Sequence, residues 1–172
     1  MNRIIPEVIN NFNVYKSGNR LIGVTSEMTL PDIVSMTETI SGAGLLGEYE
    51  TVLLGHYSSI EQEIPFRILE DDIFTLANPM DVQEITLRGT QQISDRDASL
   101  KTQGMRIVER GRVKTFKQGT LKMGGQMGSS VVLEVFYILI EVNNEVKFEL
   151  DKLNEVLKIN GVDVMAQIKQ YC

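Results

Sequence analysis

The sequence contains no tryptophan, one histidine (His56) and one cysteine (Cys172). A single cysteine cannot form a disulfide within the chain, and metal sites that need two cysteines or a pair of histidines are excluded. The same scarcity leaves little basis for redox chemistry. We therefore predict neither a metal site nor a cofactor.

Residues arranged for catalysis are also lacking. His56 has no nucleophile motif such as Gly-x-Ser-x-Gly, and a lone strand histidine is usually structural. The adjacent carboxylates Asp71 and Asp72 point about 100° apart on a helix, so they cannot flank one bond as acid and base. The glycine-rich segment 122–130 lacks a Gly-Lys-Ser/Thr ending, and 95–99 lacks the glycine and glutamate of a calcium loop. We predict that the protein is not an enzyme.

Positive charge is in short supply, since 17 basic residues face 23 acidic ones and the formal net charge is −6. A negative net charge does not favour binding to a run of phosphates, so we predict no sequence-specific nucleic-acid binding.

Long apolar runs are missing too, and Met1 to Asn10 has no apolar core of signal-peptide length. We expect a protein that is made and kept in the cytoplasm and that does not insert into membranes as a monomer.

Length and periodicity predict one domain, residues 1–172, built mostly of strands. Turn-forming residues such as Ser17-Gly18-Asn19 and Asn160-Gly161 separate the periodic segments. The predicted elements are a hairpin over 12–24, an extended segment over 28–40, strands over 59–66, 82–93 and 145–151, and helices over 69–76 and 163–171, the second capped by Asp163.

The strongest strand signal is the apolar segment 131–142, and its apolar residues on both faces predict a strand that is buried on both sides. Strict alternation puts Tyr137 and Leu139 on the same face as Val131. Asn143-Asn144 then fits a tight turn. Together these patterns predict a mainly β fold with short helices (α+β), an antiparallel β-sandwich or barrel, rather than alternating βαβ units.

Residues 106–122 form a basic strip, with six basic residues against one acid, Glu109, for a net charge of +5. The rest of the chain holds 11 basic and 22 acidic residues, a net of −11. The strip is either a solvated strand face or a surface that meets an acidic neighbouring copy. Its basic residues are Arg106, Arg110, Arg112, Lys114, Lys117 and Lys122.

A set of separated motifs runs along nearly the whole chain. The motifs are Asn11-Phe-Asn-Val-Tyr15, Gly18, Leu21-Ile-Gly-Val24, Thr29-Leu-Pro31, Ser41-Gly-Ala-Gly44, Gly47, Thr86-Leu-Arg-Gly89, Phe148-Glu-Leu-Asp-Lys-Leu-Asn154 and Lys158-Ile-Asn-Gly-Val-Asp163. In order and spacing the sequence resembles the major tail tube proteins of contractile-tailed phages and of related phage-tail-like particles. The likeness is loosest from Asp95 to Ser130.

This resemblance implies a structural subunit that assembles into six-membered rings, stacked as a hollow tube inside a contractile sheath. Its implied partners are other copies of the chain, the tail sheath protein, and the tape measure and baseplate proteins. The implied location is the host bacterial cytoplasm during assembly, then the virion tail or a released extracellular particle. An acidic conduit suits DNA passage, because a surface that attracted phosphates would hold the DNA.

Two sets of residues are candidates for contacts between copies. Gly42, Gly44 and Gly47 would bend the chain toward a neighbour. The basic strip would supply Arg106, Arg110, Arg112, Lys114 and Lys117. An unpaired strand edge is itself a template for joining another copy, and a ring of copies closes that edge.

Two other functions remain open from the sequence. A tube subunit of a contractile secretion or injection system would have the same sequence features. A monomeric β-sandwich binding module would need a concave aromatic surface, but the five tyrosines and six phenylalanines are scattered.

Overall fold

The computed structural model describes residues 4–95, 97 and 99–172. Met1 to Arg3, at the start of the segment considered as a signal peptide, and Arg96 and Ala98, in the 95–99 segment, lie outside the described residues. The described elements are β1 (Ile5–Lys16), β2 (Asn19–Arg20), β3 (Ser35–Ser41), β4 (Glu48–Tyr57), β5 (Glu61–Phe66), α1 (Asp71–Leu76), β6 (Gln83–Ser94), β7 (Leu100–Lys117), β8 (Ser129–Val142), β9 (Glu145–Asp151), β10 (Val156–Ile159), β11 (Val162–Asp163) and α2 (Ala166–Tyr171). The predicted fold class, mainly antiparallel β with short helices, is confirmed.

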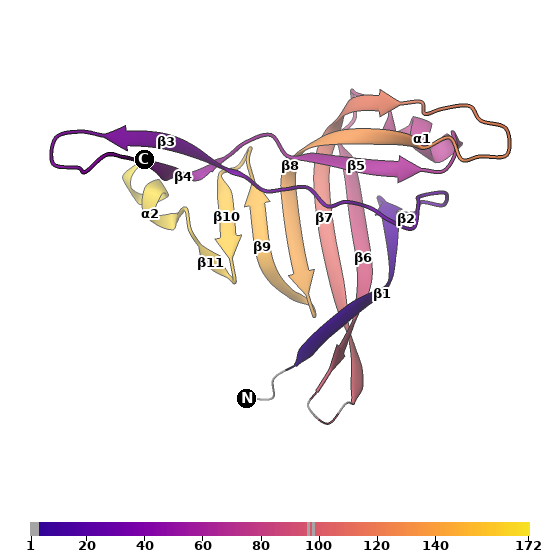
Figure 1. Cartoon of the computed structure of the whole chain (residues 1–172), viewed down its shortest axis with the longest axis horizontal. Coiled ribbons are helices and arrows are strands. Elements are labelled where there is room, and N and C mark those ends of the chain that lie inside the picture. Colours follow the sequence, from indigo (N-terminus) through magenta and orange to yellow (C-terminus); the bar gives the residue numbers. More distant parts are fainter. Residues whose placement is uncertain (1–3, 96, 98) are drawn as a thin grey trace.

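Among the described residues, nine strands form one sheet in the order β11-β10-β9-β8-β7-β6-β1-β2, with β5 attached to β8. Strand β8 pairs with three other strands of this sheet. It pairs with β7 along one edge, while its other edge pairs first with β5 and then with β9. Because β5 and β9 share an edge, the sheet divides there, and β5 crosses the top of the molecule above the steep strands β6 to β9 (Figure 1).

The core lies where β5 and α1 meet the sheet. Ile64 and Phe66 of β5, Ile73 and Leu76 of α1, and Ile85 of β6 are all fully buried. Full burial of an apolar side chain of this size contributes about 1.5–3 kcal/mol. This cluster therefore holds β5 and α1 against the sheet, and it keeps β5 paired with the first half of β8.

The polar residue in the apolar face of β5, Gln62, is buried with its neighbours. Its Nε2 donates hydrogen bonds to the backbone carbonyl oxygens of Thr29 and Glu63, at 2.9 and 2.7 Å. A buried amide costs stability unless it is bonded. Gln62 thus ties β5 to the segment that precedes β3.

The face assignment predicted for the second half of β8 is wrong. The β7–β8 pairing shifts register at Phe136, which is an extra residue on β8, a β-bulge. An extra residue exchanges the two faces beyond it, so Ile138 continues the buried face, in place of Tyr137 and Leu139.

Gly111 lies opposite this bulge on β7. A Cβ atom at this position would lie 2.4 Å from the carbonyl oxygen of Glu134. The two strands approach this closely only because Gly111 has no side chain.

The predicted turns are confirmed. Ser17 and Gly18 join β1 to β2, Asn143 and Asn144 join β8 to β9, and Asn160-Gly161 joins β10 to β11, each with positive φ angles. Asparagine and glycine adopt this left-handed conformation at low cost, so short turn motifs alone specify these connections.

The two helices are present but shorter than predicted. Helix α1 begins at Asp71, and its first turn carries Asp71 and Asp72, where the helix dipole favours negative charge. The expectation that Asp163 caps the last helix is wrong, because α2 begins at Ala166. Asp163 lies in β11, and its Oδ1 accepts a hydrogen bond of 2.9 Å from the N–H of Met165.

Candidate assembly surfaces

Within the described residues, no group of three or more His, Cys, Asp and Glu side chains is arranged as a metal site. His56 lies exposed on β4, and Cys172 is exposed. No helix in the described ranges has the length and apolar content to span a membrane. The prominent features are a set of charged and apolar surfaces.

The first surface is the basic strip, whose residues lie mostly on β7. Arg106 forms a bidentate pair with Glu141 of β8, at 2.6 and 2.7 Å. Arg110 pairs with Glu84 of β6 at 2.7 Å, and its guanidinium lies 4.6 Å from the ring centre of Tyr137. Hydrogen bonds from Arg106 hold the pKa of the Glu141 carboxyl below its usual value.

The lysines of the strip also find acids on neighbouring strands. Lys114 contacts Glu61 and, at 3.5 Å, Glu134, while Lys117 contacts Glu63 at 2.8 Å. The hydrogen bond from Lys117 is the main cause that lowers the pKa of Glu63. The strip is therefore largely neutralised within one chain, by acids that are remote in sequence.

Arg112 and Lys122 differ from the rest of the strip, because neither forms an ion pair with a described residue. Of the five strip residues predicted to contact a neighbouring copy, Arg112 alone thus keeps its charge unmatched within the described part of the chain. A contact of the strip with another copy remains a prediction.

The single acid of the strip, Glu109, is fully buried. It lies opposite Ile85 and Ile138, and both carboxyl oxygens lack a hydrogen-bond partner among the described residues. Burial raises the pKa of Glu109 to about 8. The side chain is therefore mostly protonated at pH 7, and it adds no negative charge to the strip.

The second surface is an arm formed by β3 and β4, which, in the part of the chain that the structure describes, pair only with each other. The arm projects to the left of the body in Figure 1. Gly42, Gly44 and Gly47 lie in its tip, and Gly44 and Gly47 have φ angles of 93° and 107°. Their predicted role in bending the chain is thus confirmed for these two residues, while their contact with a neighbouring copy remains a prediction.

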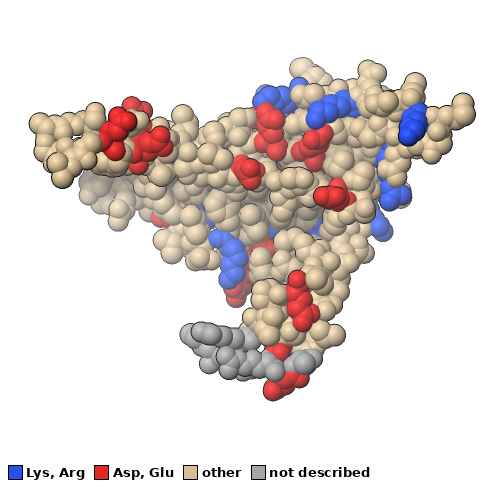
Figure 2. Space-filling view, in the orientation of Figure 1, with Lys and Arg blue, Asp and Glu red and all other residues tan. Residues whose placement is uncertain are grey.

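The arm is both apolar and acidic. Its side chains Leu46, Tyr49 and Val52 are 110%, 54% and 59% exposed. Residues 35–57 contain three glutamates and no lysine or arginine. The glutamates are Glu38, Glu48 and Glu50. Figure 2 shows red acidic side chains on this arm, whereas blue basic side chains gather toward the other end of the molecule.

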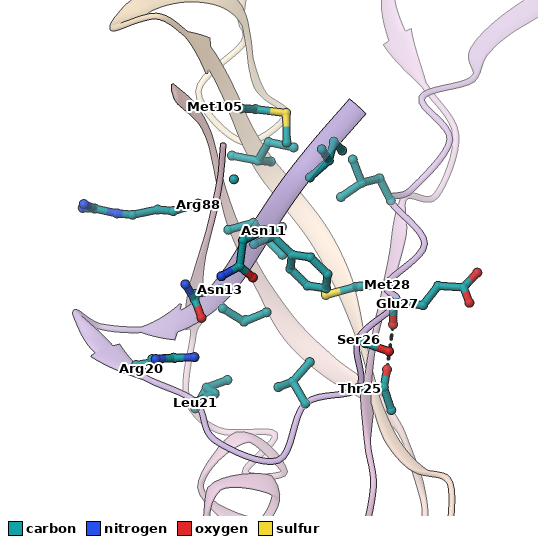
Figure 3. Close-up of a pocket in the computed structure, with 18 of the residues that line it drawn as sticks. Asn11, Asn13, Arg20, Leu21, Thr25, Ser26, Glu27, Met28, Arg88 and Met105 are labelled. Atoms are coloured by element: carbon teal, nitrogen blue, oxygen red, sulfur yellow. Dashed lines mark hydrogen bonds between the residues drawn. The ribbon is translucent and has the colours of Figure 1, made fainter. Parts of the chain in front are cut away.

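The third surface is a groove of about 870 Å³ beside β1 (Figure 3). One side is β1 over residues 9–14, and the facing side is the segment 20–30. The apolar lining includes Phe12, Leu21 and Met28. Figure 3 shows Asn11 and Asn13 on β1, with Thr25 to Glu27 across the groove.

The residues around the groove include Arg20, Arg67 and Arg88 and one acid, Glu27, but Figure 3 shows the side chains of Arg88 and Glu27 pointing away from the space between β1 and the segment 20–30. None of these arginines forms an ion pair within the described residues, although Arg88 lies 5.6 Å from the ring centre of Tyr15.

Strand β1 also exposes its backbone at this groove. Its outer edge pairs with β2 only at Tyr15 and Lys16, so residues 5–13 have no strand partner on that side among the described residues. An unpaired edge of this length is a template for another strand. Sequence analysis singled out Gly42, Gly44 and Gly47 at the arm tip, but it predicted neither the projecting hairpin nor the groove, which forms because the segment 20–30 lies opposite β1 in the folded chain.

A strand-rich chain whose exposed arm, groove and sheet edge have no partner among the described residues has the features of a subunit that assembles with other chains. Comparison with known proteins identifies the kind of assembly. A family model described as phage tail tube protein FII matches residues 6–171. The chain therefore belongs to the phage tail tube protein family, whose members are structural components of the virion.

Two relatives agree with this assignment. The chain is 26% identical over 166 residues to the tail tube protein of Escherichia phage P2, covering 95% of each chain. It is 25% identical over 157 residues to the major tail tube protein of Serratia phage KSP20, covering 91% of this chain and 90% of the relative. The resemblance drawn from separated motifs is confirmed.

Proposed function

We propose that this protein is the repeating subunit of the inner tube of a contractile phage tail or phage-tail-like particle. Six copies form a ring, and stacked rings enclose a continuous channel. The protein acts as a rigid conduit and performs no catalysis. Its tail partners are the sheath protein outside the tube, the tape measure protein and the baseplate.

The observation that carries this proposal is the match to the tail tube family over residues 6–171. The free edge of β1 over residues 5–13 supports it, because edge-to-edge or arm-to-edge contacts repeated around a ring would cover the unpaired backbone. The net charge of −6 is compatible with a channel through which DNA slides. Copies assemble in the host bacterial cytoplasm and end in the virion tail or in a released extracellular particle.

Electron microscopy of the concentrated protein tests this proposal. We expect rings or hollow tubes of uniform width, with six-fold symmetry in end-on views. A seed of purified baseplates should speed their growth. A protein that stays dispersed at high concentration and also fails to extend a baseplate seed would contradict the proposal, and rings with another symmetry would contradict the six-copy arrangement.

A further inference from the structure

We propose that the β3–β4 arm of one copy docks into the groove beside β1 of a second copy of the same chain. This inference rests on the proposed tube function and identifies the two surfaces that meet. The arm is defined as residues 35–57, and the groove as the cavity between residues 9–14 of β1 and the segment 20–30.

The arm needs a partner because it forms a sheet of only two strands. A two-stranded hairpin is marginally stable in water unless it packs against another element. Around its tip, Leu45 and Leu46 are 44% and 110% exposed, and Ile40 and Tyr49 are paired across the two strands at 36% and 54% exposed. Such a run of exposed apolar side chains on a projecting element marks an interaction site.

The groove offers what such a hairpin requires. Its apolar lining can receive the arm's side chains, and the free backbone edge of β1 can pair with an incoming strand. The arm of the same chain does not fill it, because the arm points away from β1 and β2 (Figure 1). The occupant therefore comes from another chain.

The charges of the groove and of the arm favour a second copy of the chain as the occupant. Arg20 and Arg67 line the groove, while the side chains of Arg88 and Glu27 point away from it (Figure 3). The arm carries three glutamates and no lysine or arginine. Arm and groove thus have opposite charge, and neither surface has ion-pair partners within the described part of its own chain. Complementary potentials of this kind orient an encounter and disfavour arm-to-arm contact.

The two surfaces are different, and the arm lies on another part of the molecule than β1 and β2, which border the groove (Figure 1). An interface between two different patches of one chain is heterologous, so each bound copy still presents a free arm and a free groove. Such contacts continue from copy to copy until a ring closes or a filament forms. This is the type of contact that a tube subunit needs.

Disulfide cross-linking tests the contact directly. In a Cys172→Ser background, one variant carries Leu46→Cys at the arm tip, and a second, with a tag of different size, carries Ile22→Cys in the groove lining. Both positions are well exposed, at 110% and 74%. Leu153→Cys, at 71% exposed and outside the groove lining, replaces the groove variant in the matched control.

We expect a covalent heterodimer from the mixture of arm and groove variants, and at least about tenfold less from the arm and control variants. Equal yields from both mixtures would overturn the docking proposal. Electron microscopy of the wild type reports on the tube separately. Tubes without the arm-to-groove cross-link would refute only this docking, whereas the cross-link without tubes would support the docking and count against the proposed function.

A charge exchange gives a second test that does not depend on cysteine geometry. Reversing two arm acids (Glu48→Arg and Glu50→Arg) should lower association roughly tenfold or more, because arm and groove then repel. Adding Arg20→Glu and Arg67→Glu to the same chain should restore association. These four side chains are exposed, and circular dichroism checks that each variant stays folded. Unchanged association of the arm variant would contradict the proposed contact.

Discussion

Replacing Glu109 by glutamine should stabilise the monomer, and the gain should depend on pH. Glutamine keeps the size of the buried side chain and removes its ability to ionise. Burial raises the pKa of Glu109 from 4.5 to about 8. Between these values the unfolded chain holds an ionised carboxylate while the folded chain still holds the proton, so folding must take up a proton.

The sign and size of the effect follow from this difference. The stability contributed by a raised pKa is fully present below pH 4.5 and is lost as the pH rises through about 8. Each pKa unit corresponds to about 1.4 kcal/mol, so at pH 7 the wild type carries a penalty of about 3 kcal/mol at most. We expect Glu109→Gln to recover about 1–3 kcal/mol at pH 7 and almost nothing at pH 4.5, because the buried amide also needs partners.

Urea unfolding of the dilute monomer, followed by circular dichroism from pH 4.5 to 8.5, measures this difference. Glu63→Gln is the matched control, because hydrogen bonds from Lys117 and Ser130 lower the pKa of Glu63. That variant should lose stability by an amount that stays nearly constant from pH 8.5 down to about pH 5, because a lowered pKa loses its stabilising contribution only as the pH falls from 4.5 toward the lowered value. A Glu109→Gln protein whose stability relative to wild type does not change with pH would refute the reasoning.

Three further predictions use the same unfolding assay or electron microscopy. Gly111→Ala should destabilise the monomer by about 1–3 kcal/mol, because the added methyl group meets backbone at the bulge, whereas Gly104→Ala, with open space around it, should change stability far less. Leu133→Ala should cost about 2–5 kcal/mol through the cavity it leaves in the core, and a loss below 1 kcal/mol would show that the site collapses. If the basic strip contacts a neighbouring copy, Arg112→Glu should reduce tube yield more than Arg110→Glu, since Arg110 is already paired within its chain; equal yields from both variants and the wild type would exclude that contact.

Local features of the fold were predictable because neighbouring residues specify them. The turn at Asn143-Asn144 needs only residues that tolerate positive φ, and the buried face of β5 follows from the alternation that includes Ile64 and Phe66. Glu109 carried a readable signal as well, since it lies in phase with Ile107 and Val113 on β7. Its burial could therefore have been predicted from the same alternation that located the other strands.

Features that depend on distant residues were not predictable from one sequence. The bulge at Phe136 depends on the absence of a side chain at Gly111, 25 residues earlier in the chain. The acids that neutralise the basic strip lie on other strands, as for Arg110 and Glu84. The groove exists only because the segment 20–30 lies opposite β1 in the folded chain.

The division of the sheet at β8 has a mechanical consequence. Strand β8 is bonded along both edges, to β7 on one side and to β5 and then β9 on the other. The hydrogen bonds of antiparallel strands lie perpendicular to the strand direction. A force along β8 therefore loads all of these bonds together in shear, whereas a force across the sheet would open them one after another. The subunit therefore resists deformation along this strand more than deformation across the sheet, and the strand links its arm-bearing top to the steep strands below (Figure 1).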